Sequence, residues 1–318
     1  MPQSLDDYAQ WLAERDLRWP AAPKFEPIAA APFLKPLPGI KAVAWDVYGT
    51  LLRISDGELL FVHPQSLRME VALDKTIQEF NMWQSMSRKP GKPWEYMLQL
   101  YTNAYDDLRL AGSGRKGDLP EVDSARIWLK ILEKLDKNDY QYDEGQHGDL
   151  EHLSQKVAYF YHSCLQGLEA SVGAASTVHA LGEAGIRQGL LADGQCFTPT
   201  QMLRAFRAGG TLPEPAGWIA PKLSTLSFLE GVRKPSKSLY LAAAQRFRDA
   251  GFDPDQVLFV SSRLREDLVV AKSVGFRTAL YAGEKLSLKA TASDLKDQAV
   301  KPDRLLTQLT QVRDLLEL

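Results

Sequence analysis

The segment that most constrains the fold of this chain is a short apolar run that ends in an acid and a turn, KAVAWDVYGTLL at residues 41–52. Residues 43–45 are predicted to form a strand buried on both faces, because such a run between turn signals is typical of the centre of a parallel sheet. Asp46 then lies at the carboxyl end of this strand, the edge at which open α/β sheets bind ligands. Gly49 allows a sharp turn, and the Thr50 hydroxyl can brace it. The segment alone leaves two interpretations open, a functional carboxylate or a plain strand end.

Length, charge and cysteine content narrow the class of protein. The chain has 318 residues, enough for one large α/β domain and a smaller one. Its 38 basic and 40 acidic residues give a net charge of −2 without a block of like charge, so neither a nucleic acid nor a membrane is predicted as a partner. The first residues do not resemble a signal peptide and no run of about 18 apolar residues occurs, so we expect a cytoplasmic protein. Cys164 and Cys196 are too isolated to indicate a disulfide framework or a thiolate zinc site.

Helical patterns dominate the first half of the chain. A helix over residues 4–15 is predicted by a capping box and by apolar residues on one face. The proline-rich stretch at residues 20–38 cannot continue a helix, and we expect it to lie over the main domain as an extended arm. Long amphipathic segments then follow without an intervening strand, which indicates an inserted helical domain. These segments span residues 67–86, 93–110, 122–135 and 152–168.

Strands and helices alternate from about residue 173 onward, in the order typical of a doubly wound parallel sheet. The last segment of this pattern, residues 303–316, is predicted to be a helix. The predicted fold class is therefore α/β, a Rossmann-like doubly wound parallel sheet with an inserted helical cap. The expected parts are an N-terminal helix and proline-rich arm at residues 1–39, an α/β core at residues 40–56 and 171–318, and a helical cap at residues 57–170.

Two further places carry candidate chemistry where a strand ends or a helix begins. Asp193 and Gly194 follow an apolar strand, so they would lie on the same sheet edge as Asp46. Lys234 precedes Pro235 at a predicted helix start, where the positive end of the helix dipole attracts anions. Taken alone, each place fits a helix cap or a solvated surface charge equally well.

A last candidate segment, residues 258–267, runs from an apolar strand through a polar loop into a helix. Ser262 lies in the loop and Asp267 at the start of the helix. An acid in the first turn of a helix is favourable for structural reasons alone. The order of all these motifs along the chain is what indicates that they form one site.

Taken in that order, the motifs resemble those of the haloacid dehalogenase superfamily of hydrolases. The similarity covers residues 40–55 and again about 173–318, with the helices between them in the place of the superfamily's inserted cap. The resemblance implies that Asp46 is the nucleophile and that Lys234, in a Gly-x-Arg-Lys-Pro context, steadies negative charge. Tyr48 stands where phosphatases of this superfamily have a second acid.

Three positions depart from the phosphatase pattern. Tyr48, with a reference pKa of about 10, is a poor replacement for an acid that protonates a leaving oxygen. Ala192 stands where the superfamily has Ser or Thr, and Ser262 replaces the first acid of the fourth motif, in which Asp267 remains. Because Mg²⁺ prefers several oxygen ligands, a site held only by Asp46 and Asp267 would be weak. The segments around Asp46 and Ser262 instead resemble the dehalogenase branch, in which an aspartate displaces halide from carbon and no metal is required.

The predicted function is hydrolysis of a small anionic substrate, either a carbon–halogen bond or a phosphate ester, through an ester on Asp46 that water resolves. The alternative is a protein that keeps the fold but has lost catalysis and serves as a binding or scaffold module. The expected catalytic residues are Asp46, Tyr48, Lys234 and Asp267. The expected substrate-binding residues are Thr50, Asp193, Gly194 and Ser262.

Two other features complete the expectations. The stretch at residues 197–221 is longer than a connection needs and is predicted to be a lid, a contact surface or a loose loop. Aromatic residues of the cap, such as Trp94, Tyr101 and Trp128, are expected to fill its core rather than to stack on a substrate.

Overall fold

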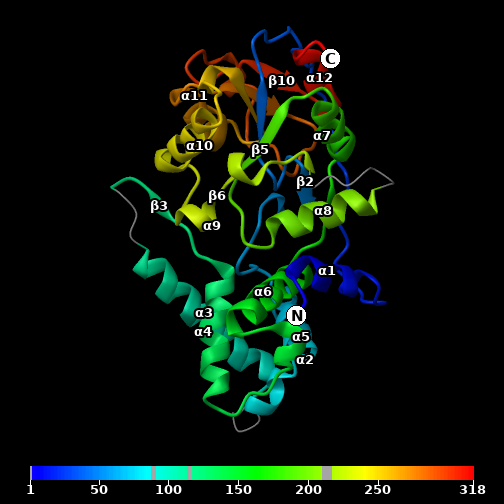
Figure 1. The fold of residues 1–318 in the computed structure, drawn as a ribbon, viewed down its shortest axis with the longest axis vertical. Helices are drawn as coiled ribbons and strands as arrows, with labels where there is room; N and C mark the ends of the chain where they lie inside the picture. Colours follow the sequence, from blue (N-terminus) through cyan, green and yellow to red (C-terminus); the bar gives the residue numbers. More distant parts are fainter. Residues whose placement is uncertain (1, 87–90, 113–115, 210–216) are drawn as a thin grey trace.

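The computed structural model describes residues 2–86, 91–112, 116–209 and 217–318. It has a sheet flanked by helices at one end of the molecule and a bundle of helices at the other (Figure 1). The first helix, α1 (Leu5–Ala13), lies between these two parts and packs on both. Among the described residues, no helix is both long enough and apolar enough to cross a membrane.

Within the described residues, the core sheet has six parallel strands in the order β10-β9-β8-β1-β5-β6. From β1 the chain builds outward through β5 and β6, and it then returns to the other side of β1 to add β8, β9 and β10. β1 is therefore at the topological switch point, where the carboxyl ends of parallel strands open a crevice for a ligand. This arrangement confirms the predicted doubly wound core. The strands are β1 (Ala42–Trp45), β5 (Arg187–Ala192), β6 (Thr225–Leu226), β8 (Val257–Ser261), β9 (Arg277–Tyr281) and β10 (Arg304–Leu306).

Alternate residues of β1 show how both faces of the sheet are covered. Val43 and Trp45 pack with side chains of α7, α8 and α12 on one face. Ala42 and Ala44 pack with side chains of α10 and α11 on the other. Because both faces exclude water, the strand is apolar throughout rather than alternating. The core helices are α7 (Ala174–Glu183), α8 (Thr198–Ala208), α9 (Ser227–Glu230), α10 (Lys237–Asp249), α11 (Val269–Ser273) and α12 (Val312–Leu315).

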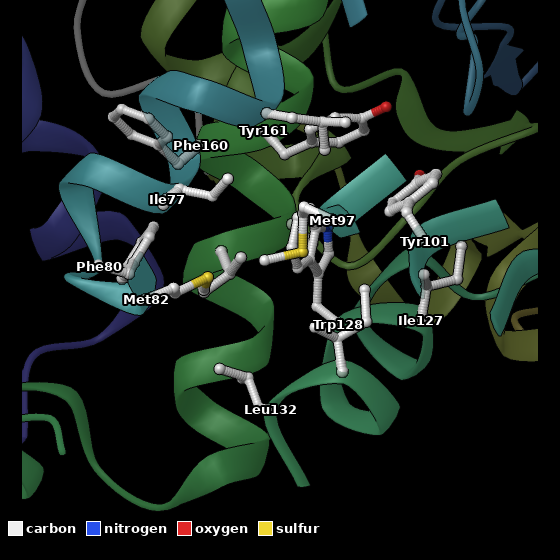
Figure 2. Close-up of a cluster of buried hydrophobic side chains, with 14 of the residues drawn as sticks. Ile77, Phe80, Met82, Met97, Tyr101, Ile127, Trp128, Leu132, Phe160 and Tyr161 are labelled. Carbon is white, nitrogen blue, oxygen red and sulfur yellow. The ribbon is translucent and has the colours of Figure 1, made fainter. Parts of the chain in front are cut away.

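The helical bundle packs around a core rich in aromatic side chains (Figure 2). The ring centroid of Tyr101 lies 5.4 Å from that of Trp128 and 4.8 Å from that of Tyr161. Tyr101 and Trp128 thus fill the core of the bundle, as predicted. The helices of the bundle are α2 (Ser66–Glu79), α3 (Pro93–Ala111), α4 (Ser124–Asp136), α5 (Glu144–His147) and α6 (Leu150–Leu165).

Two small antiparallel pairs, which the sequence pattern did not indicate, join the bundle to the core. β2 (Leu52–Ile54) pairs with β4 (Leu168–Ala170), so the segments entering and leaving the bundle lie side by side. β3 (Leu119–Pro120), a segment between α3 and α4, pairs with β7 (Val232–Arg233), which leads into Lys234. The second pair therefore holds a segment of the bundle directly against the lysine loop of the core.

The N-terminal segment follows the molecule from the bundle to the far side of the sheet. The capping box predicted for the first helix is present, with Ser4 and Asp7 bonded to each other's backbone amides. After α1 the chain is extended, as expected of the proline-rich arm. Phe33 forms antiparallel backbone hydrogen bonds with Leu305 of β10, and the Leu37 amide donates to the carbonyl of Leu315 at 2.8 Å. The exact limits of arm, core and cap remain a prediction.

Three predicted elements differ from the structure. The helix expected over residues 303–316 is wrong at its start, because the segment first forms β10 and is helical only from Leu309. The helix expected over 67–86 stops at Glu79, since Asn81 has a φ of 49°, and a 3₁₀ turn follows. The described part of residues 197–221 is mainly α8, a core helix rather than a loose loop, while residues 210–216 lie outside the described part. Short 3₁₀ turns lie at Ser55–Gly57, Met82–Met86, Pro221–Leu223, Pro254–Gln256, Asp294–Lys296 and Leu309–Gln311.

Candidate functional site

Three neighbouring strands deliver polar residues to one edge of the sheet. Asp46 follows β1 and its amide donates to the carbonyl of Val260 at 3.0 Å. Asp193 follows β5, and Ser261 is the last residue of β8. Since β1 lies between β5 and β8, the Asp46 carboxylate lies at the centre of this edge.

The side chain of Lys234 joins two acids that are far apart in the sequence. Its Nζ donates to Asp46 Oδ1 at 2.7 Å and to Asp267 Oδ2 at 2.6 Å. The side chains of Asp46, Lys234 and Asp267 are only 6%, 2% and 0% exposed. The structure therefore brings together the three residues that the order of motifs had placed in one site, and it buries them as an ion-paired cluster.

Ser261 and Tyr240 complete this cluster and were not predicted. Ser261 Oγ lies 2.6 Å from Asp267 Oδ2 and 3.3 Å from Asp46 Oδ2, so its proton can serve either carboxylate. The Tyr240 hydroxyl lies 3.3 Å from Asp267 Oδ1 and donates to the Glu266 carbonyl at 3.0 Å. The place of Ser261 at a strand end could have signalled its role, whereas nothing in the sequence distinguishes Tyr240 from a core residue of α10.

A wide helical turn positions Asp267. Residues Leu264–Leu268 form a π-helical turn in which the Leu268 amide donates to the carbonyl of Arg263 at 3.2 Å. The extra residue in this turn lets Asp267 point at the end of the sheet while α11 continues behind it. Such single π turns inside helices are frequent at functional sites.

The charged groups of the cluster shift one another's pKa values. Burial lowers the pKa of Lys234, but the carboxylates of Asp267 and Asp46 outweigh this and raise it above its ordinary value. Burial raises the pKa of Asp46, and the ammonium of Lys234 opposes that shift. Arg263 behaves like Lys234. Burial lowers its pKa, but neighbouring carboxylates outweigh burial and raise the pKa. Both basic side chains are therefore charged at neutral pH.

Tyr48 lines the site but its hydroxyl is already engaged. The hydroxyl donates to Gln201 Oε1 at 2.7 Å and lies 2.9 Å from Thr198 Oγ1, both on α8. Burial raises the pKa of Tyr48 above its ordinary value. The hydroxyl therefore keeps its proton at neutral pH and is held by the core helix.

Three of the expected substrate-binding residues brace loops of the site, namely Thr50, Gly194 and Ser262. The Thr50 hydroxyl accepts a hydrogen bond from the Ser262 amide at 3.2 Å. The Gly194 amide donates to Ser227 Oγ at 3.0 Å. Gly49 has a φ of +89°, and a Cβ there would lie 3.0 Å from Ser262 Oγ, so the turn after Asp46 needs a glycine.

A small cavity of about 50 Å³ opens onto the cluster. Asp46, Tyr48, Lys234 and Arg263 line it from the core, together with Asp193, which the sequence had indicated as a substrate-binding residue. The segments that lead into the bundle, or come from it, contribute Glu58, Leu59, Phe61 and Glu121. The cavity therefore lies where the helical bundle meets the carboxyl edge of the sheet.

The donors around Asp46 do not fit a hard divalent cation. Among the described residues, no group of three or more His, Cys, Asp and Glu side chains gathers as a metal site. The Lys234 ammonium bonds to both Asp46 and Asp267, where a shared cation would have to sit. Mg²⁺ requires near-octahedral oxygen ligands, which these two engaged carboxylates and the Tyr48 side chain do not supply.

Part of the chain matches the model of a known protein family. Residues 231–312, which include Lys234 and Asp267, match the model of the HAD-hydrolase-like family, and this confirms the resemblance to the haloacid dehalogenase superfamily. No curated protein matches the sequence. The 2-haloacid dehalogenase from Pseudomonas syringae pv. tomato DC3000 is similar in structure, with 19% identity over 87% of this chain and 98% of that chain, and a TM-score of 0.49. The L-2-haloacid dehalogenase from Xanthobacter autotrophicus with chloropropionic acid covalently bound has 22% identity over 87% of this chain and 98% of that chain, and a TM-score of 0.41.

Proposed function

We propose that this HAD-hydrolase-like chain hydrolyses a small anionic substrate through an ester on Asp46, without a metal ion. The observation that carries the proposal is the Lys234 ammonium, 2.7 Å from Asp46 Oδ1 and 2.6 Å from Asp267 Oδ2. A lysine in this place supplies positive charge beside the nucleophile. Asp46 also lines the cavity, so a substrate bound there meets its carboxylate.

The leaving group that suits this site departs from carbon. In the first step an Asp46 oxygen attacks the substrate carbon, and the bond to the leaving group breaks with its electron pair. A halide leaves without a proton, whereas the alkoxide of a phosphate ester needs an acid. The engaged hydroxyl of Tyr48 favours the halide. Water then attacks the ester carbonyl of Asp46, the hydroxy acid leaves, and the carboxylate is restored.

Arg263 supports an anionic substrate. Its guanidinium lies 3.5 Å from Glu58 Oε2 and 3.8 Å from Glu266 Oε2, both longer than a strong charge-assisted hydrogen bond. Within the described part of the chain, Arg263 Nε is buried without a hydrogen-bond partner. Arg263 lines the cavity, so its positive charge favours a substrate carboxylate there, and the cavity volume of about 50 Å³ favours a short acid.

The test is a panel of short 2-halo acids and simple phosphate esters, assayed for halide or phosphate release with Mg²⁺ and with a chelator. We expect turnover of a 2-halo acid that is the same in both conditions. Asp46→Asn should lower it by at least about a thousandfold, because an amide oxygen cannot serve as the nucleophile. A single turnover in ¹⁸O-labelled water should place the label in Asp46 rather than in the product.

The matched control is Asp255→Asn, which removes an exposed carboxylate outside the cavity and should leave turnover unchanged. Turnover that survives in Asp46→Asn, or that appears only with Mg²⁺ and a phosphate ester, would contradict the proposal. A wild type that turns over none of these substrates would favour the alternative of a binding or scaffold protein.

A further inference from the structure

A carboxylate of the helical bundle reaches the cavity of Asp46. Glu121 lies between β3 and α4, and its side chain lines the same small cavity as Asp46. Its amide donates to the Gly231 carbonyl at 3.0 Å, directly beyond the pairing of β3 with β7. This backbone contact fixes Glu121 against the loop that carries Lys234.

The Glu121 carboxylate is held by two uncharged donors. Ser227 Oγ donates to its Oε2 at 2.5 Å, and the Val122 amide donates to its Oε1 at 2.8 Å. Ser227 is fully buried and also accepts from the Gly194 amide, so its position is set by the core. Burial raises the pKa of Glu121 to about 7, and the hydrogen bond from Ser227 opposes this shift. The carboxyl group can therefore gain or lose a proton near neutral pH.

Two other acids near the nucleophile, Asp267 and Asp193, are engaged with the lysine and its loop. Asp267 accepts from Lys234, has Ser261 Oγ at 2.6 Å and the Tyr240 hydroxyl at 3.3 Å, and is fully buried, so water in the cavity does not reach it. Asp193 lines the cavity, but its Oδ1 accepts from the Lys234 amide at 2.9 Å and thereby holds the lysine loop.

We propose that Glu121 is the general base that activates water for hydrolysis of the Asp46 ester. This proposal rests on the proposed function. The water oxygen bonds to the carbonyl carbon of the ester while Glu121 takes one of its protons. The bond from that carbon to the substrate oxygen then breaks, and Glu121 passes the proton to the departing alkoxide. The second water proton is released to solvent as the Asp46 carboxylate is restored.

The first test uses Glu121→Gln in the full chain with chloroacetate as substrate. General-base catalysis contributes about a hundredfold to ten-thousandfold, so we expect turnover to fall by that factor. Ester formation does not require Glu121, so rapid acid quenching followed by intact-mass measurement should reveal accumulated ester in Glu121→Gln. Asp46→Asn should form none. Glu133→Gln, an exposed position on α4, is the matched control and should behave as the wild type.

The second test is the pH dependence of ester hydrolysis. A base must be deprotonated to accept a proton, so the rate should rise with pH through about 7, the pKa of Glu121, and level off above it. Ser227→Ala removes the hydrogen bond that lowers this pKa and should move the rising limb to higher pH. The charged groups that act on Glu121 are Asp193 after β5 and Arg233 in β7. The other charged side chains that line the same cavity are Asp46, Glu58, Lys234 and Arg263.

The outcomes separate this proposal from the function on which it rests. If the wild type forms no ester and no product, the hydrolase proposal fails. If the wild type turns over and Glu121→Gln is equally fast, or loses activity without accumulating ester, the assignment of Glu121 is overturned. The rising limb of the pH–rate profile could stay unshifted in Ser227→Ala and disappear in Asp193→Asn. That result would assign the base to Asp193 instead.

Discussion

At the scale of single residues, His162 is a buried base whose environment keeps it neutral. Its Nε2 lies 2.9 Å from Ser124 Oγ, and its ring packs 4.8 Å from the ring of Phe197. Burial lowers its pKa from 6.5 to about 3. Since the unfolded chain binds a proton at a higher pH than the folded chain, the stability from this group is complete above pH 6.5 and is lost as the pH falls.

We therefore predict that His162→Gln removes part of the acid sensitivity of the protein. Between pH 6.5 and pH 4, the wild type should lose free energy of unfolding relative to the variant at up to about 1.4 kcal/mol per pH unit. Urea unfolding at a series of pH values measures this difference. His152→Gln changes an exposed histidine and serves as the control. Parallel pH profiles for the wild type and His162→Gln would contradict the prediction.

At the scale of elements, Gln195 connects the start of a bundle helix to the core. Its Oε1 accepts from the Ser124 amide at 2.8 Å, and its Nε2 donates to the Val122 carbonyl at 3.0 Å. We predict that Gln195→Met lowers the free energy of unfolding by about 1–3 kcal/mol, because it leaves buried backbone groups unpaired. Gln245→Met, at an exposed position of α10, should change it by less than about 0.5 kcal/mol. Equal midpoints and slopes in urea for both variants would show that the contact does not stabilise the fold.

The elements also show what the sequence could predict. β1 is apolar along its whole length and β8 is apolar from Val257 to Val260, so their burial and their place in a parallel sheet follow from the pattern. β10 has only three residues, and its strand conformation depends on pairing with β9 and the arm, which no local pattern records. Propensity alone therefore favoured a helix there.

The candidate site also contains residues that could be predicted from the sequence and residues that could not. Asp46, Lys234 and Asp267 could be grouped because motif order places them on one edge of a doubly wound sheet. Tyr240 and Glu121 could not, since a packing contact of α10 and the approach of a bundle segment to the core bring them there. The roles of all these residues in catalysis remain predictions.

At the scale of the whole molecule, α1 connects the bundle to the core. Leu12 is fully buried in the hydrophobic cluster of the bundle, and Thr200 Oγ1 of α8 donates to Asp6 Oδ1 at 2.5 Å. We predict that Leu12→Ala costs about 2–5 kcal/mol and that hydrogen exchange then rises in both α6 and α8. Gln10→Ala, on the exposed side of the same helix, should leave exchange unchanged. Faster exchange confined to α1 would mean that this helix does not couple the two parts.

The contact of Phe33 with Leu305 has a consequence for solubility. β10 is the last strand on its side of the sheet, and an uncovered last strand offers free amides and carbonyls to strands of other molecules. The Phe33 amide donates to the Leu305 carbonyl at 2.8 Å, and the Leu305 amide donates back at 3.4 Å. Prolines at positions 32 and 36 carry no amide hydrogen with which the arm could recruit a further strand. The arm thus covers the edge strand β10 and prevents it from pairing with strands of other molecules.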